Sequence, residues 1–204
     1  NEIDYRKFVG ILRKIGFSHV IEVAFGADLV SYHFKELVTN NPGKHYISTS
    51  CPSIVSYIEK FHPGLVRNLA PIASPMIAIG RVIHRMYGDD MGIVFVGPCL
   101  AKKDEAERKG IKDVITEVLT FSELRDLIEM NNITLDRVEP SDFDPPHPGK
   151  GTLFPIGRGM LQSAGIQEDL MTNTVFATDG TKQFVHTLKE FEKIPHGIKL
   201  LELL

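Results

Sequence analysis

Two cysteines, Cys51 and Cys99, are the residues of this chain best suited to chemistry. Each follows a short apolar run and lies next to a proline, in the segments Thr49-Ser50-Cys51-Pro52 and Gly97-Pro98-Cys99-Leu100. This pattern predicts that each cysteine lies where a strand gives way to a helix, the place where α/β proteins present side chains to ligands. A thiol at such a position is often an exposed thiolate, which can act as a nucleophile or a metal ligand.

The residues alone leave other roles for the two thiols open. A free cysteine is often an inert core residue. A zinc site would need histidine ligands, because neither cysteine is part of a Cys-x-x-Cys pair, and the eight histidines are scattered without ligand spacing. A cysteine nucleophile with a histidine base is another alternative with weak specific support. The low cysteine count and the lack of a secretory segment argue against a disulfide.

Two further features accompany the cysteines. Lys102 and Lys103 fall in the expected first turn of the helix after Cys99. A cation there could face an anionic ligand, although a solvated helix surface continued by Asp104 would give the same pattern. The segment Gly157-Arg158-Gly159 is too short for a dinucleotide fingerprint and instead indicates a close approach of the backbone to a neighbour.

The elements that must position these residues follow from the periodicity of the apolar side chains. Helical and extended segments alternate, which is typical of an α/β fold with parallel sheets. We expect helices over residues 5–15, 28–37, 53–61, 75–87, about 122–130 with Ser122 as its cap, and 182–192. We expect strands over residues 19–24, 45–49, 91–96, 113–119, 174–177 and 197–204. The stretch 139–151, rich in proline and glycine, predicts a long loop that is functional or crosses between lobes.

Composition narrows the classes of function. The 204 residues suffice for one large domain or two small lobes. The net charge of -3 gives no reason to expect a nucleic acid or an anionic membrane as a partner. No apolar run is long enough to cross a bilayer, and the first residues do not form a signal peptide. We therefore expect a cytoplasmic protein.

The motifs around the cysteines resemble those of a known family. The stretch 49–63, TSCPSIVSYIEKFHP, is similar to the first cluster-binding motif in the catalytic domain of the iron-only (FeFe) hydrogenase large subunit. The pair Ser74-Pro75 and the stretch 97–106, GPCLAKKDEA, resemble the second, Pro-Cys-x-x-Lys-x-x-Glu. The opening segment 12–29 is similar to the entry into that domain, so the resemblance covers nearly the whole chain.

The resemblance implies a cofactor and a set of site residues. In this family four cysteines hold a 4Fe-4S cluster, and one of them bridges to a di-iron subsite. By resemblance, Cys51 and Cys99 are two of the four metal ligands. Residues implied to bind the cofactor are Cys51, Cys99, Ser74, Pro75, Pro98 and Lys102, and those implied at the catalytic centre are Ser50, Lys102 and Glu105.

The resemblance also implies an architecture. It predicts two α/β lobes, each a mostly parallel sheet flanked by helices, with the cluster crevice between them. Lobe one would contain about residues 1–48 and 144–204, and lobe two about residues 49–143. The family's last two cysteines follow a strand like 197–204, so we expect these 204 residues to be an excised segment that lacks the cofactor and is inactive alone.

Several departures from the family pattern bear on activity. Where active members carry a proton-relay cysteine, this chain has Ser50, whose hydroxyl is a far weaker acid than a thiol. The carboxylates that members place after Gly-Ala-Asp-Leu are replaced around Tyr32, His33 and Phe34. This pattern is similar to that of hydrogenase-like domains attached to signalling modules.

The resemblance therefore predicts a hydrogenase-like iron-sulfur domain that senses hydrogen or redox state, or turns over hydrogen slowly. Its expected partners are hydrogen, protons and flanking ferredoxin-like or signalling modules. One alternative is an active hydrogenase in the full-length protein. The other is a metal-free binding module of flavodoxin-like topology, in which both cysteines would be buried and unreactive.

Overall fold

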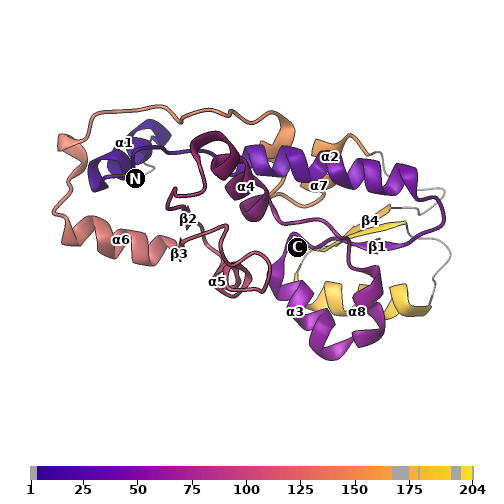
Figure 1. Ribbon diagram of the computed structural model, residues 1–204. Helices are drawn as coiled ribbons and strands as arrows, with labels where there is room; N and C mark the ends of the chain where they lie inside the picture. Colours follow the sequence, from indigo (N-terminus) through magenta and orange to yellow (C-terminus); the bar gives the residue numbers. More distant parts are fainter. Residues whose placement is uncertain (1–3, 167–174, 179, 194–198, 204) are drawn as a thin grey trace. The chain divides into compact units, whose positions relative to one another are not determined.

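The computed structural model describes residues 4–166, 175–178, 180–193 and 199–203. Figure 1 shows the elements in chain order. The helices are α1 (Tyr5–Ile15), α2 (Ala24–Asn40), α3 (Pro52–Phe61), α4 (Pro75–Tyr87), α5 (Ala101–Ala106), α6 (Phe121–Met130), α7 (Gly159–Ala164) and α8 (Thr181–Lys193). The strands are β1 (Tyr46–Ile47), β2 (Val94–Val96), β3 (Glu117–Leu119), β4 (Val175–Thr178) and β5 (Leu200–Leu203). Short 3-10 helices are η1 (Pro63–Asn68), η2 (Leu135–Arg137) and η3 (Lys150–Leu153).

The chain folds into two compact units. The first contains Asn1–Val23 and Ile83–His147, and the second contains Ala24–Val82 and Pro148–Leu204. The chain passes between the two units after Val23, after Val82 and after His147. The predicted lobes were about residues 1–48 with 144–204, and about residues 49–143. Residues 49–82 fold with 24–48 because the chain after η1 returns to β1, where the Ala70 N–H donates to the Ile47 carbonyl at 2.9 Å.

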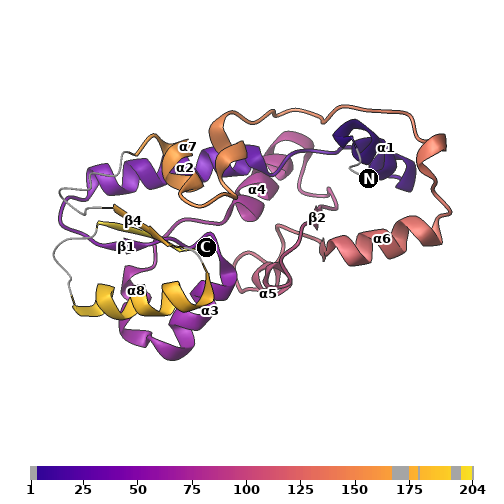
Figure 2. The ribbon, with the colours of Figure 1, turned by 180° about the vertical axis from the view of Figure 1, so that it is seen from behind.

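The second unit is built on a parallel sheet. Among the described residues its strand order is β1-β5-β4, and Leu200 lies opposite Tyr46 on one side and Val175 on the other. Helices α2 and α7 lie on one face of this sheet and α3 and α8 on the other, as Figures 1 and 2 show from opposite sides. Strand β5 is buried because it has a neighbouring strand on each side and helices on both faces.

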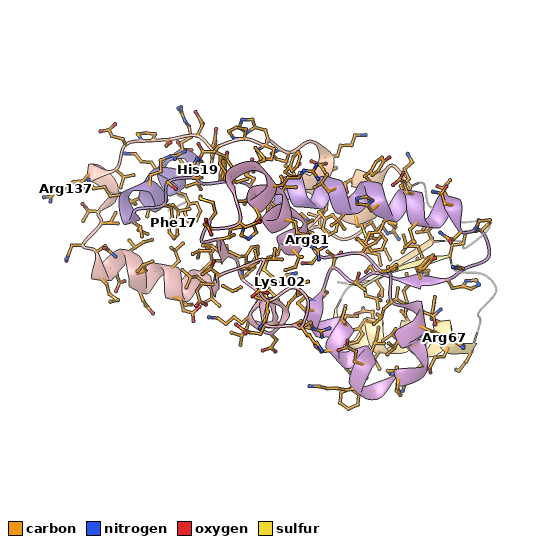
Figure 3. All side chains as sticks on the ribbon, viewed as in Figure 1. Phe17, His19, Arg67, Arg81, Lys102 and Arg137 are labelled. Atoms are coloured by element: carbon orange, nitrogen blue, oxygen red, sulfur yellow. The ribbon has the colours of Figure 1, made fainter. Side chains whose placement is uncertain are left out.

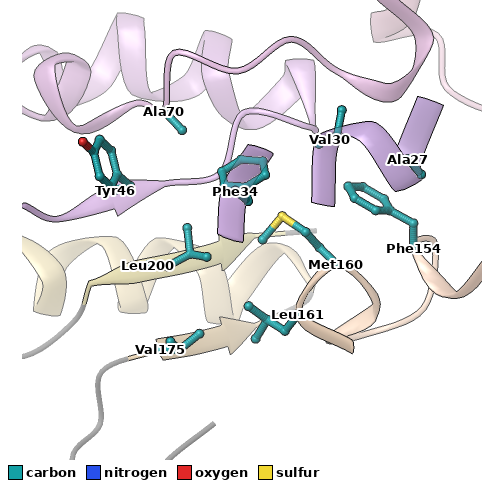
Figure 4. Packing of buried hydrophobic residues seen from close by; sticks show 10 residues of the cluster. All are labelled: Ala27, Val30, Phe34, Tyr46, Ala70, Phe154, Met160, Leu161, Val175 and Leu200. Carbon is teal, nitrogen blue, oxygen red and sulfur yellow. The ribbon is translucent and has the colours of Figure 1, made fainter. Parts of the chain in front are cut away.

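Alternate residues of β5 enter two different hydrophobic clusters. Leu200 packs with Phe34 of α2 and with two residues of α7, as Figure 4 shows. Leu201 and Leu203 pack in the other cluster, with Ile58 of α3 and Leu188 of α8. The predicted last strand is therefore confirmed over the residues that the structure describes.

The first unit contains the parallel pair β2 and β3, in which Val94 lies opposite Glu117 and Val96 opposite Leu119. The pairing continues one residue past β2, where the Gly97 N–H donates to the Leu119 carbonyl at 3.0 Å. A core cluster joins α1, α6 and β2; its members include Val9, Leu12, Leu124 and the partly buried Val96. The predicted α/β class, with parallel sheets flanked by helices, is confirmed.

The strand predicted over residues 19–24 is wrong. Within it, both backbone groups of Val20 are bonded to Asp144. The Val20 N–H donates to Asp144 Oδ2 at 2.7 Å, and the Asp144 N–H donates to the Val20 carbonyl at 2.8 Å. These bonds occupy the backbone of Val20, residues 19–22 form no strand, and α2 already begins at Ala24.

None of the helices in the described parts of the chain is both long and apolar enough to span a membrane.

Candidate functional site

Cys51 lies in the second unit at the junction between β1 and α3. It is the N-cap residue of α3, with φ -100° and ψ 108°, and Pro52 follows at the first helical position. Its thiol is free and half-buried, and it packs at the edge of the cluster formed by α3, α8 and β5. The structure thus confirms the predicted local setting of Cys51.

The loop that carries Cys51 is held by bonds to two neighbouring segments. The Ser48 N–H donates to the Leu201 carbonyl at 2.8 Å, and the Leu203 N–H donates to Ser48 Oγ at 3.2 Å. Thr49 Oγ1 lies 2.7 Å from the Ile72 carbonyl and 3.2 Å from the Ala70 carbonyl, so its proton can be donated to either. These contacts fix the backbone directly before the thiol. Sequence reasoning missed them, although hydroxyl residues just after a strand are a recognisable signal.

Ser50 and Ser74 also belong to the second unit. The side-chain oxygen of Ser50 is buried. Ser74 is 2% exposed and caps α4, since its Oγ accepts the Ile77 N–H at 3.5 Å and its carbonyl accepts the Ala78 N–H at 2.8 Å. Pro75 then occupies the first turn of α4, where its missing N–H costs no helical bond. A helix start therefore explains Ser74-Pro75 locally.

Cys99 lies in the first unit, directly after β2. Its carbonyl accepts the Lys102 N–H at 3.2 Å, which begins the turn that leads into α5. The thiol is free and half-buried, and Pro98 beside it is exposed. The strand-to-helix setting predicted for Cys99 is therefore confirmed as well.

Lys102 and Glu105 form a buried ion pair one turn apart on α5. Lys102 Nζ donates to Glu105 Oε2 at 2.6 Å, and the two residues are 9% and 7% exposed. The sequence analysis assigned both residues to the site but did not predict an ion pair between them. Burying two charges costs desolvation energy, which this short charge-assisted hydrogen bond offsets in part. The bond also fixes the position of the Lys102 ammonium.

Lys103, by contrast, lies at the surface. Its Nζ donates to Glu123 Oε1 at 2.9 Å, and both side chains are substantially exposed. The pKa of Glu123 is lowered from 4.5 to about 2, first because its carboxylate accepts the Thr120 N–H and then because of Lys103. This pairing explains Lys103 as a structural residue of the first unit.

The segment Gly157-Arg158-Gly159 behaves as its composition predicted. Arg158 has a positive φ of 64°, and a Cβ on Gly159 would lie 1.8 Å from the Leu153 carbonyl oxygen. The next residue, Met160, donates its N–H to Glu202 Oε1 at 3.2 Å. Glu202 is 1% exposed on the central strand β5. Sequence reasoning missed this buried carboxylate, whose signal was a charged residue inside an apolar strand.

The predicted site residues fall into two groups. The second unit holds Ser50, Cys51, Ser74 and Pro75, and the first unit holds Pro98, Cys99, Lys102 and Glu105. Within the described parts of the chain, no group of three or more histidine, cysteine or acidic side chains is arranged to hold a metal ion. A zinc site assembled from the histidines therefore has no support there.

Comparison with known proteins agrees with this fold. The family model of the iron-only hydrogenase large subunit, C-terminal domain, matches residues 2–199. Iron hydrogenase 1 of Clostridium pasteurianum is 29% identical over 177 residues, covering 78% of this chain and 31% of that protein. The cytosolic Fe-S cluster assembly factor NAR1 of Yarrowia lipolytica is 30% identical over 105 residues, covering 48% of this chain and 21% of its own length.

A solved structure shows the same fold. A variant of HydA1, an FeFe-hydrogenase of Chlamydomonas reinhardtii, has a TM-score of 0.78 with 16% sequence identity. The match covers 98% of this chain and 70% of that one. At this identity the likeness shows the fold alone.

Parallel strands flanked by helices make this an α/β fold, which the chain shares with the solved FeFe-hydrogenase structure. The chain belongs to the family of C-terminal domains of the iron-only hydrogenase large subunit. It spans about a third of the length of the Clostridium relative.

Proposed function

We propose that this protein is a hydrogenase-like iron-sulfur domain that senses hydrogen or redox state, or turns over hydrogen slowly. The observation that carries the proposal is the matched placement of its two cysteines. Cys51 and Cys99 each lie free and half-buried between a parallel strand and a helix, one in each unit of a chain that belongs to the hydrogenase family.

The donor set fits half of a 4Fe-4S cluster. Such clusters are held by four cysteine thiolates, and this chain holds two cysteines. A complete cluster would need two further thiolates that these 204 residues do not supply. When bound, the cluster would supply reversible one-electron transfer, and the di-iron subsite the chemistry of hydrogen.

The protein residues would position the cofactor. The bonds of Ser48 and Thr49 would fix the Cys51 thiolate, and the turn after β2 would fix Cys99. Lys102 would present a cation to the anionic ligands of the cofactor, and Glu105 would hold that cation in place. Ser74, Pro75 and Pro98 would line the site through the helix start of α4 and the turn after β2.

Slow turnover is proposed because this chain lacks good proton carriers at the relay positions. Ser50 offers a hydroxyl, which is a poor proton donor at neutral pH. Where the family places carboxylates, Phe34 is fully buried in the core of the second unit. The nearby carboxylate of Glu36 lies at the surface and accepts a bond from Tyr32 at 2.9 Å. A sensing role needs ligand binding but no rapid proton delivery.

Hydrogen evolution by the matured full-length gene product tests this proposal. We expect a rate at least about a hundredfold below that of the Ser50→Cys variant, since a positioned general acid contributes about 10² to 10⁴ in rate. Ser50→Ala serves as the matched control and should change little. Rapid evolution by the wild type that Cys51→Ala abolishes would instead support the alternative of an active hydrogenase.

The metal-free flavodoxin-like module makes a different prediction. It requires both thiols to be inert, whereas they are half-buried. Alkylation of the native 204-residue segment, before any iron is supplied, therefore separates the two proposals. Modification of Cys51 and Cys99 by iodoacetamide within minutes would support accessible ligands, and protection of both until the protein unfolds would support the metal-free module.

The setting of the protein is proposed on the same basis. We infer a cytoplasmic compartment, where thiols stay reduced, and partners that are flanking ferredoxin-like or signalling modules of the same polypeptide. Hydrogen and protons would be the small-molecule partners. The net charge of -3 supports neither nucleic acid nor membrane as a partner.

A further inference from the structure

The second unit contains a pocket that uses none of the proposed iron-sulfur residues. It has a volume of about 560 Å³, which is in the range of small-ligand sites. Residues 29–41 at the middle and end of α2, the segment 71–73 and the middle of α4 form its walls. All of its lining residues belong to the second unit, so the pocket does not depend on how the two units are placed.

The base of the pocket is apolar. Leu37, Ile72 and Ala78 line it and are packed against the hydrophobic cluster beneath. Because this base rests on a buried core, its shape is set before a ligand binds. Covering it with the apolar part of a ligand would remove apolar surface from water and so favour binding.

One wall of the pocket carries a guanidinium cation. Arg81, labelled in Figure 3, extends from α4 and forms no hydrogen bond or ion pair with any residue that the structure describes. A guanidinium presents its donors in a planar fork that matches a carboxylate. Arg81 is therefore the group of this pocket best placed to bind an anion.

The carboxylate contributed by α2 is already engaged. Glu36 Oε1 accepts the Tyr32 hydroxyl at 2.9 Å, and His33 Nδ1 lies 3.5 Å from Glu36 Oε2. Because the carboxylate of Glu36 has local partners on α2 and the guanidinium of Arg81 has none among the described residues, the pocket favours a ligand with an anionic group.

We propose that this pocket binds a small organic carboxylate, with its apolar body on Leu37, Ile72 and Ala78 and its carboxylate on Arg81. The proposal goes beyond the proposed iron-sulfur function and does not rest on it. It gives the second unit a small-molecule site lined by α2 and α4.

Binding of 4-phenylbutanoate to the purified protein at pH 7.5, followed by amide chemical shifts, tests the proposal. We expect saturable binding with a dissociation constant on the order of 1 mM, and shifts at Leu37 and Ala78. Arg81→Gln should weaken binding about tenfold, because it removes a charge-assisted pair but keeps much of the length of the side chain. Arg67→Gln, which changes an arginine of η1 outside the pocket, should bind as the wild type does.

Ligand charge provides the second comparison. The neutral 4-phenylbutan-1-ol should bind about tenfold more weakly than the carboxylate, and Arg81→Glu should reverse the order of the carboxylate and 4-phenylbutylamine. Equal binding of 4-phenylbutanoate by wild type and Arg81→Gln would overturn the proposal. Tighter binding of the amine to the wild type, or the absence of saturable binding by the carboxylate, would also overturn it.

Discussion

The buried pair of Lys102 and Glu105 carries a testable energetic consequence. Removing one partner of a buried ion pair leaves the other as an uncompensated charge, which costs about 3 to 5 kcal/mol. Lys102→Met should therefore lower the free energy of unfolding by about 3 kcal/mol or more, because Glu105 is only 7% exposed. Urea unfolding monitored by circular dichroism measures this loss.

The neighbouring residue supplies the control. Lys103 is bonded to Glu123 at the surface, and exposed pairs contribute about 1 kcal/mol or less. Lys103→Met should therefore have a small effect. The double variant Lys102→Met/Glu105→Met should recover part of the lost stability, since no charge then remains buried. Equal losses for Lys102→Met and Lys103→Met would mean that the α5 pair is not buried in solution.

At the scale of elements, the start of α6 corrects the sequence-based expectation. Ser122 was predicted to cap this helix, but the cap is Thr120. Its Oγ1 accepts the Glu123 N–H at 3.3 Å, and Glu123 Oε2 accepts the Thr120 N–H at 2.8 Å. The sequence contains the signature of this capping box, Thr-x-x-Glu, at residues 120–123. The prediction was wrong because it took the hydroxyl of Ser122 as the cap.

Paired substitutions distinguish the two candidate caps. Thr120→Ala should lower the free energy of unfolding by about 1 kcal/mol, the usual cost of losing a cap. Ser122→Ala should change it by less than about 0.5 kcal/mol, since Ser122 lies inside the helix. Chemical unfolding of both variants decides between them, and a larger loss for Ser122→Ala would contradict the capping box.

The same helix start gives stability a dependence on pH. The pKa of Glu123 is about 2 in the folded protein and near 4.5 when unpaired. Because the folded pKa is depressed, its contribution is fully present above pH 4.5 and is lost as the pH falls from 4.5 toward 2. The stability difference between wild type and Glu123→Gln should therefore shrink over that interval. A difference that stays constant from about pH 6 to about pH 3 would contradict this assignment.

The junction of α2 with η3 depends on a glycine. A Cβ on Gly151 would lie 2.0 Å from the Ala24 carbonyl oxygen, and the Gly151 N–H donates to Asp28 Oδ1 at 2.6 Å. Gly151→Ala should lower the free energy of unfolding by about 2 kcal/mol or more, because the obstructing atom is backbone. Thermal unfolding measures the change. Gly64→Ala, where no atom lies within 4 Å of the added Cβ, should be nearly neutral.

At the scale of the whole molecule, helix bounds could be predicted from the sequence, whereas contacts between residues far apart in the chain could not. Tyr5–Ile15 and Pro75–Tyr87 were predicted with correct bounds, because apolar spacing and end signals lie within each helix. The setting of both cysteines was predictable for the same reason. The segment 19–24 was not, since its partner Asp144 is more than a hundred residues away.

The division of the chain into two units likewise depends on long-range contacts. Ala70 returns to Ile47 and keeps residues 49–82 with β1, which composition cannot indicate. The burial of Glu202 has the same origin, because its strand runs between β1 and β4 while α7 covers its face. A charge pattern alone could not separate this carboxylate from a solvated one.

Cluster ligation by Cys51 and Cys99 is best tested by electron paramagnetic resonance of the anaerobically reconstituted full-length gene product, reduced with dithionite. We expect the signal of a reduced 4Fe-4S cluster in the wild type, which should bind about four iron atoms per protein chain at this site. We also expect loss or a clear change of this signal in both Cys51→Ala and Cys99→Ala, but not in Ser50→Ala. Absence of bound iron in the wild type, or an unchanged signal in both cysteine variants, would contradict the proposal that these two residues hold the cluster.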